Sequence, residues 1–174
     1  METKLFASAA ALVFIAGCAS MGSPAPTARA ELEPTKGNSV KGTVTFQQAG
    51  DKVRVSATIT GLKPNAEHGF HVHEKGDCSS GDGMSAAGHF NPAGKTHGDY
   101  RAAGERHAGD MPNLVADGYG NATASFDVTG LAVGGGAADI VGKGLIVHRD
   151  PDDYKSQPAG NAGPRLACAV IQKT

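Results

Sequence analysis

Tryptophan is absent from the 174-residue chain, aromatic residues make up only 5%, and neither sign of charge dominates. The 16 Lys and Arg residues against 17 Asp and Glu give a formal net charge of -1 without a basic block, which argues against a nucleic-acid-binding protein. No apolar run reaches the roughly 20 residues that a membrane-spanning helix needs. The length suggests one domain.

Glycine, in contrast, is plentiful at 25 residues and indicates many turns and long loops. Apolar and polar residues alternate over 40–46 and 53–59, with a short Ala-Gly-Asp link that predicts a hairpin. A second hairpin is predicted from "NLVAD", a "GYGN" turn and "ATASFDV". Further strands are predicted at "HGFHVHE", "KGLIVHRD" and "PRLACAVIQ". We therefore predict an all-β fold, a Greek-key antiparallel β-sandwich or barrel of about eight strands.

Two long segments interrupt the strand pattern. Residues 75–111 and 150–164 are polar and rich in glycine, and they hold or adjoin most of the seven histidines. Loops of this length in a compact domain are usually functional or disordered. We expect the chemistry of the protein in these two loops.

The first 17 residues have the pattern of a secretory signal. Lys4 precedes an apolar run from Leu5 to Ala16, which is too short to span a bilayer and suits a signal h-region. The run ends in Ile-Ala-Gly-Cys, which resembles the lipobox of bacterial lipoproteins and predicts a lipid on Cys18. The alternative is an ordinary signal, cut for example after the "ARA" at 28–30. In both cases the chain is exported, and residues 18–38, rich in Ser, Pro and Ala, are predicted to be a flexible tether before a domain at 39–174.

Export also bears on the three cysteines. If Cys18 carries the lipid, Cys78 and Cys168 remain, and in an oxidising compartment they are expected to form a disulfide. Two free thiols or two thiolate metal ligands are the alternatives. With a lipid anchor, the protein would lie in the periplasm or cell envelope, attached to a membrane only through that anchor.

The histidines form a pattern that suits two metal ions. His71 and His73 stand at i and i+2, so in a strand both point to one face, roughly 6.6 Å apart along the chain. Six histidines and one aspartate are candidate ligands: His71, His73, His89, His97, His107, Asp110 and His148. Seven groups are too many for one four-coordinate site and fit two sites that share a residue. Four imidazoles suit Cu(II), and a tetrahedral set of imidazoles and carboxylate suits Zn(II).

Several motifs, in fixed order over residues 39–173, resemble Cu/Zn superoxide dismutase of the bacterial exported kind: "GFHVHEKGD", "AGHFNP", "RHAGDMPN" and "GNAGPRLACAVI". The resemblance implies copper held by His71, His73, His89 and His148. It implies zinc held by His89, His97, His107 and Asp110, with His89 as the bridge. The implied reaction is disproportionation of superoxide to dioxygen and hydrogen peroxide, with copper alternately reduced and oxidised.

The resemblance implies further roles. Arg165 matches the arginine that docks superoxide beside copper, and Asp152 matches the carboxylate that joins a copper histidine to a zinc histidine, with the adjacent Asp153 as the other candidate. Cys78 and Cys168 match the family disulfide. His68 matches a structural histidine that bonds to backbone, and our strand phase also places it away from the ligand pair.

Three questions stay open from the sequence. For Lys143 and Lys155, a contribution to a field that guides superoxide and an ordinary solvated charge are both retained. The chain is either a monomer or a homodimer. Two other functional hypotheses remain. A copper-storing lipoprotein without turnover would explain the histidines but not Arg165 or the two-site ligand count. A structural sandwich with incidental histidines predicts that His-to-Ala changes leave the metal content untouched.

Overall fold

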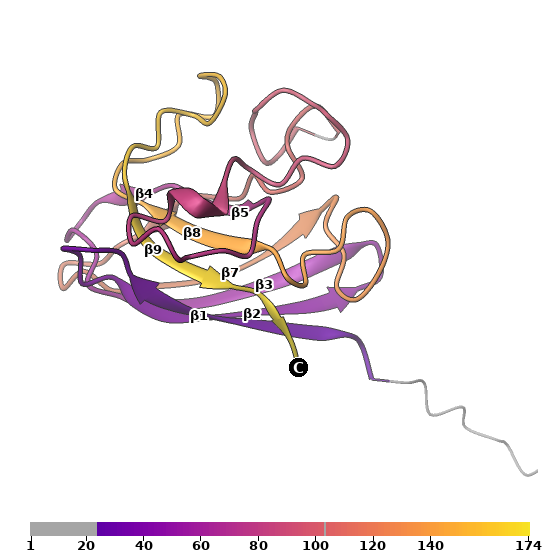
Figure 1. Ribbon diagram of the computed structural model, residues 1–174, viewed down its shortest axis with the longest axis horizontal. Helices are drawn as coiled ribbons and strands as arrows, with labels where there is room; N and C mark the ends of the chain where they lie inside the picture. The colour runs from indigo at the N-terminus through magenta and orange to yellow at the C-terminus, as the bar shows by residue number, and fades with distance from the viewer. Residues whose placement is uncertain (1–23, 103) are drawn as a thin grey trace, which may run out of the picture.

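The computed structural model describes residues 24–102 and 104–174. This part of the chain contains strands and one short 3-10 turn, η1 (Met84–Ala86), but no α-helix (Figure 1). The strands are β1 (Thr27–Pro34), β2 (Lys41–Ala49), β3 (Lys52–Thr60), β4 (Glu67–His68), β5 (Phe70–His73), β6 (Leu114–Val115), β7 (Ala122–Thr129), β8 (Gly144–His148), β9 (Arg165–Val170) and β10 (Gln172–Lys173).

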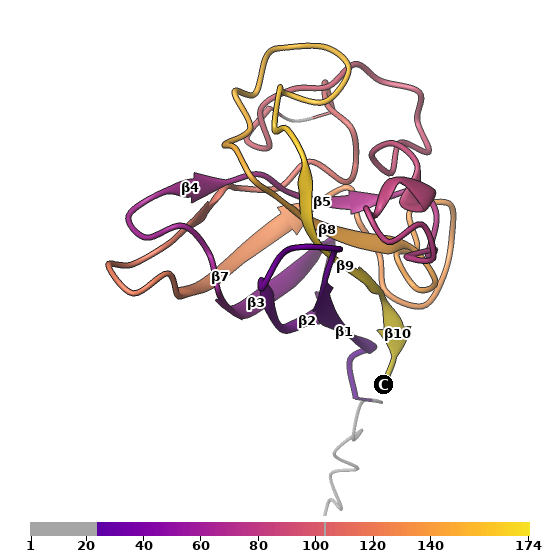
Figure 2. The ribbon, with the colours of Figure 1, turned by 60° about the vertical axis from the view of Figure 1, so that its left-hand side comes forward.

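The strands form one large, curled antiparallel sheet. Its order is β5-β8-β9-β1-β2-β3-β7, and β10 pairs with β1 as the eighth strand. The two short strands β4 and β6 make a separate pair. Seen from two directions, the sheet wraps around the core while the two long loops stand above β5 and β8 (Figures 1 and 2). The predicted all-β fold of about eight strands with two long loops is confirmed, with eight strands in the large sheet and two more in the separate pair.

The first hairpin is also confirmed. Strands β2 and β3 pair without interruption from Lys41 opposite Thr60 to Ala49 opposite Lys52. Every apolar position of the predicted alternation in this hairpin is at most 2% exposed: Val40, Val44, Phe46, Val53, Val55, Ala57 and Ile59. Period-two burial of this kind results when one face of a sheet covers the core and the other meets water.

The predicted tether at 18–38 is wrong for residues 27–34, because they form β1 between β2 and β9. Ala28, Ala30 and Leu32 are at most 2% exposed, and the charged residues between them point outward. The alternation was present in the sequence. The small side chains and neighbouring prolines of this segment give it the composition of a linker. Alanine nevertheless fills the core-facing positions of β1, because β1 lies close to two strands and to the core.

The second predicted hairpin is wrong as well. Strand β6 pairs with β4, placing Glu67 opposite Val115, and β7 pairs with β3 instead. The backbone of Asp117 does bond to the carbonyl of Asn121 at 2.8 Å, so the predicted turn forms. Its flanking strands nevertheless separate, because β7 gains a ladder running from Lys52–Thr129 to Ile59–Ala122 on β3, which a two-residue β6 does not offer.

The signal segment 1–17 and the lipid position Cys18 lie outside the described residues. Within the part described, no helix has the length and apolar character needed to cross a bilayer.

Strands β5 and β8 differ from the rest because they are buried on both faces. Phe70 and Val72 contact the core, and the alternate residues of β5 face the two long loops. The predicted functional residues lie in this space between the sheet and the loops.

Candidate metal centre

Two neighbouring strands carry the first three histidines. His71 and His73 project from the loop-facing side of β5, and His148 ends the adjacent strand β8. All three side chains are at most 5% exposed. Because alternate residues of a strand share a face, the β5 pair and His148 converge above the sheet.

A β-bulge then places Arg165 beside this group. Val147 pairs with Ala167, but His148 pairs with Arg165, so Leu166 is the extra residue on β9. Bulges bend a strand and redirect its side chains, and they occur often next to active sites. Here the irregularity brings the first residue of β9 directly opposite the last histidine of β8.

The long loop that carries His89 and Asp110 is held against β5 by backbone hydrogen bonds. Val72 donates to the carbonyl of Gly109 at 3.0 Å and accepts from the amide of Phe90 at 2.8 Å. A Cβ atom on Gly109 would lie 2.2 Å from the carbonyl oxygen of Val72, so only glycine permits this approach. The same contacts fix His89 and Asp110, the neighbours of Phe90 and Gly109, over the sheet.

The first group of potential ligands consists of four imidazoles whose donor atoms lie within 4.8 Å of one another: His71, His73, His89 and His148. One nitrogen of each ring is held by a protein oxygen. His73 Nδ1 bonds to the carbonyl of Ala87 at 2.9 Å, and His148 Nδ1 bonds to that of Gly163 at 3.0 Å. The other nitrogens face the centre of the group, and the Nε2 atoms of His73 and His148 lie 3.4 Å apart.

Carboxylates hold the other two rings of this group. His71 Nε2 bonds to Asp152 at 2.8 Å, and His89 Nδ1 bonds to Asp110 at 2.8 Å. The remaining nitrogens, His71 Nδ1 and His89 Nε2, are buried and have no hydrogen-bond partner. Buried polar atoms without partners are rare in proteins, and these two lie in the group of four rings, where a bound ion would supply the missing partner. A metal ion bound by four neutral imidazoles satisfies them, and the residues fit copper.

The second group converges on a single carboxylate oxygen. Asp110 Oδ1 lies 2.8 Å from His89 Nδ1, 3.1 Å from His97 Nδ1 and 3.4 Å from His107 Nδ1. Its other oxygen, Oδ2, accepts hydrogen bonds from the backbone amides of His107 and Gly98, which orients the carboxylate. Three imidazoles and one carboxylate, all buried, fit a tetrahedral zinc site. His89 belongs to both groups.

Asp152 connects the two groups by a hydrogen bond to one histidine of each. Its Oδ2 accepts from His71 Nε2 at 2.8 Å, and its Oδ1 accepts from His97 Nε2 at 2.9 Å. The adjacent Asp153 is not part of this connection, because its carboxylate bonds within its own loop to Ser156 and Asn161. A Cβ atom on Gly160 would lie 1.8 Å from Asp152 Oδ1, so the loop closes over the carboxylate only with glycine there.

The histidines of the site differ in the direction of their pKa shifts. Burial and the neighbouring imidazoles lower the pKa of His89 to about 4 and that of His148 to about 3. Burial alone also lowers the pKa of His97, but its hydrogen bonds to Asp110 and Asp152 outweigh this and raise the pKa to about 9. At neutral pH His89 and His148 therefore offer unprotonated nitrogens, whereas His97 holds a proton that a metal must displace.

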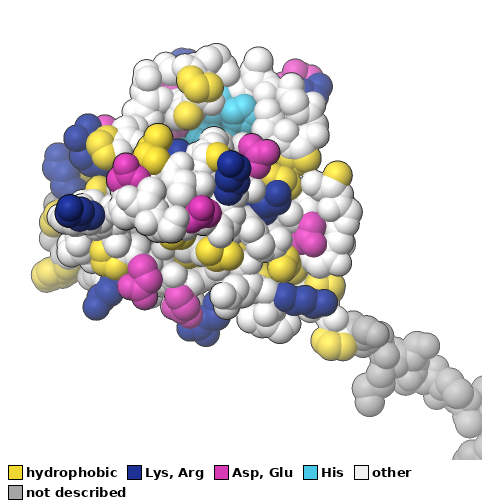
Figure 3. All heavy atoms as spheres, viewed as in Figure 1, with side chains coloured by type: hydrophobic (Ala, Val, Ile, Leu, Met, Phe, Trp, Pro, Cys, Tyr) yellow, Lys and Arg dark blue, Asp and Glu magenta, His cyan; other side chains and the backbone are white. Residues whose placement is uncertain are grey.

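A cavity of about 240 Å³ lies beside His148, one member of the first group. His148 and Arg165 line it together with Met84 and residues of the 157–163 loop. Histidine side chains are visible in a recess between the two loops (Figure 3). The guanidinium of Arg165 donates to the carbonyls of Gly83 and Ala87, both at 2.6 Å, which holds a positive charge beside His148.

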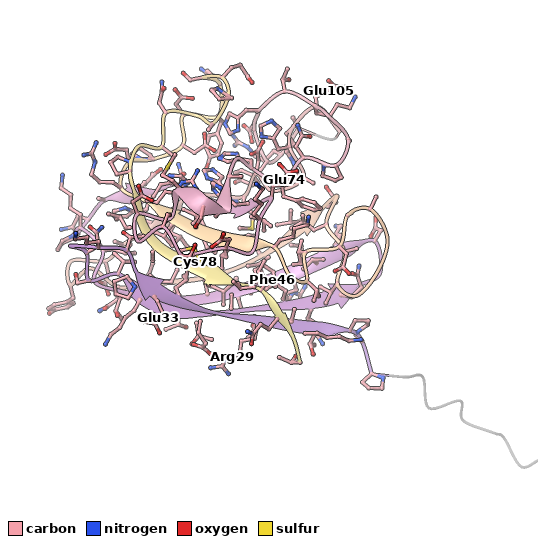
Figure 4. The ribbon with its side chains drawn as sticks, in the orientation of Figure 1. Arg29, Glu33, Phe46, Glu74, Cys78 and Glu105 are labelled. Carbon is pink, nitrogen blue, oxygen red and sulfur yellow. A yellow bond between two sulfur atoms is a disulfide. The ribbon has the colours of Figure 1, made fainter. Side chains whose placement is uncertain are left out.

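A disulfide joins Cys78 to Cys168, as predicted. Cys78 lies over β9 in Figure 4, and the bond ties the loop that carries Gly83 and Ala87 to the strand that carries Arg165. The anchor points of the arginine are thus linked covalently to its own strand.

Comparison with known proteins identifies the origin of this arrangement. Residues 40–171 match the family Copper/zinc superoxide dismutase (SODC). The chain belongs to the copper/zinc superoxide dismutase family. It is 46% identical over 138 residues to the Cu-Zn superoxide dismutase of Paramecium bursaria Chlorella virus 1, covering 76% of this chain and 72% of that one. To Cu-Zn superoxide dismutase 2 of Aquifex aeolicus it is 43% identical over 149 residues, covering 83% and 86%.

Solved structures support the same membership. The crystal structure of the clock protein EA4 superposes with a TM-score of 0.77 at 38% identity, covering 86% of this chain and 96% of that one. A double mutant of a SOD-like protein from Bacillus subtilis gives a TM-score of 0.75 at 33% identity, covering 83% and 96%. This superoxide dismutase is therefore an enzyme that uses copper and zinc, and incidental histidines no longer explain the pattern.

The structure brings together every ligand candidate predicted from the superoxide dismutase motifs. His68 is separate: its Nδ1 bonds to the backbone carbonyl of His148 at 2.9 Å, the structural contact expected for it. Lys143 lies with its ammonium 4.9 Å from the centre of the Phe90 ring, and Lys155 is exposed in the loop after Asp152.

Two supporting residues of this superoxide dismutase gave no signal in the sequence. Gln157 accepts from the amide of His97 at 3.0 Å and donates to its carbonyl at 2.8 Å, fixing that histidine from the opposite loop. Thr35 bonds to the backbone of Arg165 from the turn after β1. A polar residue in a polar loop has no pattern that would single it out.

Proposed function

We propose that the chain disproportionates superoxide at a copper ion held by His71, His73, His89 and His148, next to a zinc ion held by His89, His97, His107 and Asp110. The observation that carries this proposal is the position of His89. His89 belongs to both sets of potential ligands; its Nδ1 bonds to Asp110 of the second set, and its Nε2 has no protein partner and remains available to the first. A ring shared in this way supports one bridging ligand between two metals.

Copper, when bound, supplies the redox chemistry, accepting an electron from one superoxide and returning it to a second. The chain supplies the remaining functions. Its imidazoles are fixed in orientation before binding, because each has one nitrogen bound to a protein oxygen. Little rearrangement of the protein is then needed between the two half-reactions.

Arg165 is proposed to dock the superoxide anion. It lines the same cavity as His148, and its two bonds to carbonyls hold the guanidinium in place without neutralising it. A fixed positive charge on the wall of the cavity that His148 also lines attracts a small anion toward the metal.

His89 Nε2 is proposed to hold the proton that leaves with the product. A zinc ion on Nδ1 would keep this proton from binding too tightly, because its positive charge lowers the basicity of the ring.

Substitution of His148 by alanine tests the copper assignment. Because His148 belongs only to the imidazole group, the variant should lose copper and activity while retaining about one zinc per chain. His68→Gln is the matched control, since His68 is equally buried but lies outside both groups, and it should bind both metals. Full activity of His148→Ala, measured with metal content, would show that the copper site is elsewhere.

We also propose that the mature chain is exported and anchored by a lipid on Cys18. The Cys78–Cys168 disulfide supports an oxidising compartment. Cleavage after the "ARA" at 28–30 would remove half of β1, including the buried Ala28 and Ala30, so a cut upstream is favoured. Cys18→Ser should move the protein from the membrane fraction to the soluble fraction with its activity retained. Continued membrane attachment would exclude this anchor.

A further inference from the structure

Met84 is exposed in a position that packing does not explain. Its side chain is 60% exposed, whereas Met111 is fully buried. Met84 begins η1, and its backbone position is firmly set: Asp82 accepts from its amide at 2.9 Å, and Arg165 holds the preceding carbonyl, that of Gly83, at 2.6 Å. An apolar side chain presented to water at such a defined point contributes little to the core.

The thioether stands at the opening of the metal centre. Met84 lines the cavity of about 240 Å³ together with His148 and Arg165. His148 has its Nε2 directed into the imidazole group, 3.4 Å from that of His73. Met84 is thus a thioether-bearing residue on the wall of the cavity that His148, one of these two histidines, also lines.

The chemistry of this cavity favours a soft ligand. Arg165 repels any cation that approaches, and the exposed carboxylate of Asp82 next to Met84 offsets part of that charge. A thioether is neutral and soft, so it binds Cu(I) well and binds Zn(II) or Cu(II) much less well. The four imidazoles already complete the final site, so Met84 has no place among the resident ligands.

We propose that the sulfur of Met84 is the capture ligand for Cu(I), binding the ion at the cavity opening and passing it to His148 and His73 by ligand exchange. The inference rests on the proposed copper site and adds the route by which that site is loaded. No electron is transferred in this step: the Cu(I)–thioether bond breaks as the bonds to the two imidazole nitrogens form.

The test measures copper uptake instead of activity. The metal-free full chain is mixed anaerobically with the Cu(I)–bicinchoninate complex, and the loss of its absorbance gives the rate of transfer. Met84→Leu keeps the volume of the side chain and removes the sulfur. It should slow transfer about tenfold, equivalent to a barrier about 1.4 kcal/mol higher. The final copper content should equal that of the unaltered chain.

Two controls separate sulfur chemistry from the shape of the opening. Uptake of Cu(II) from its glycine complex should proceed at the same rate in both proteins, because a thioether contributes little to Cu(II) capture. Val115 is also exposed and lies on β6, away from this cavity, so adding Val115→Met to Met84→Leu should leave Cu(I) transfer slow.

Three outcomes would overturn the inference: an unchanged Cu(I) rate, equal slowing of Cu(I) and Cu(II), or recovery of the rate by the remote methionine. Failure of the unaltered chain to take up copper in either oxidation state would instead refute the proposed copper site itself. The two failures are therefore distinguishable.

Discussion

The hydroxyl of Thr35 donates a 2.7 Å hydrogen bond to the backbone carbonyl of Arg165. It also accepts one from the side-chain amide of Asn38 at 2.7 Å. The backbone amide of the next residue, Lys36, donates to the carbonyl of Gly81 at 2.7 Å. The turn after β1 is thus hydrogen-bonded both to β9, which carries Arg165, and to the loop whose carbonyls accept hydrogen bonds from the Arg165 guanidinium. This explains why β1 matters to the site, although it lies far from it in sequence.

Replacing Thr35 by valine should therefore lower the free energy of unfolding, although the two side chains have nearly the same volume. The change removes a buried hydroxyl and leaves the Asn38 amide and the Arg165 carbonyl without that partner, at a cost of about 1–3 kcal/mol in free energy of unfolding. Chemical denaturation of the metal-free protein measures this. Thr35→Ser, which keeps the hydroxyl and loses the methyl group, should be much less destabilising than Thr35→Val; a greater loss for Thr35→Ser than for Thr35→Val would assign the effect to packing of the methyl group.

Arg165→Ala should keep both metals but reduce kcat/KM by about tenfold or more, within the range that electrostatic guidance of a substrate covers. The dependence of the rate on ionic strength should weaken, because the charge beside His148 is gone. Arg165→Lys is the informative comparison: an ammonium keeps the charge but does not span the carbonyls of Gly83 and Ala87 as a planar guanidinium does. Recovery of the salt dependence without full recovery of the rate would separate charge from positioning.

The metal centre could be predicted from the sequence because its chemistry depends on a few residue types in a fixed order. His71 and His73 share a strand face by simple periodicity, and the remaining ligands follow in recognisable motifs. The supports of the site could not be predicted in this way. The Leu166 bulge and the Gly83 and Ala87 carbonyls act through backbone geometry, and the Thr35 hydroxyl bonds to a backbone carbonyl distant in sequence; residue identity encodes none of these contacts locally.

The two errors in the fold have a related cause. The sequence does not single out β1 as a strand, because Ala28 and Ala30 are small. The predicted partner of β6 is wrong because strand pairing depends on the whole sheet. Local alternation gives the existence of a strand, but long-range competition between ladders gives its neighbours. The prediction of the β2–β3 hairpin is confirmed. Its link is only two residues long, so the two strands pair locally without competition from strands distant in sequence.

Asp152→Asn should weaken both metal sites at once. An amide has one oxygen acceptor in place of two, so it retains the bond from His71 or the bond from His97 but not both. Loss of such an outer partner typically lowers metal affinity about 10- to 100-fold. Competition with a chelator measures the two affinities separately. Asp153→Asn is the matched control, because that carboxylate bonds only within its loop, and it should leave both affinities unchanged.

The proton held by His97 makes zinc binding dependent on pH. In the metal-free protein the pKa of His97 is raised to about 9, so its protonated form stabilises the fold below the ordinary histidine pKa, and this contribution disappears as pH rises through about 9. Zinc requires the unprotonated ring. Its affinity should therefore fall about tenfold for each pH unit below 9, as expected for displacement of one proton.

Calorimetry in buffers of different ionisation enthalpy counts the protons released at pH 7. Zinc alone should release about one proton, from His97, and copper alone fewer, because the pKa values of His89 and His148 already lie near 4 and 3. Copper added after zinc should release one further proton, since a bridging His89 gives up the proton on its second nitrogen. Equal release by the two metals, each added alone, would mean that Asp110 and Asp152 do not hold His97 in its charged form. If the second metal released none, His89 would not bridge the two ions.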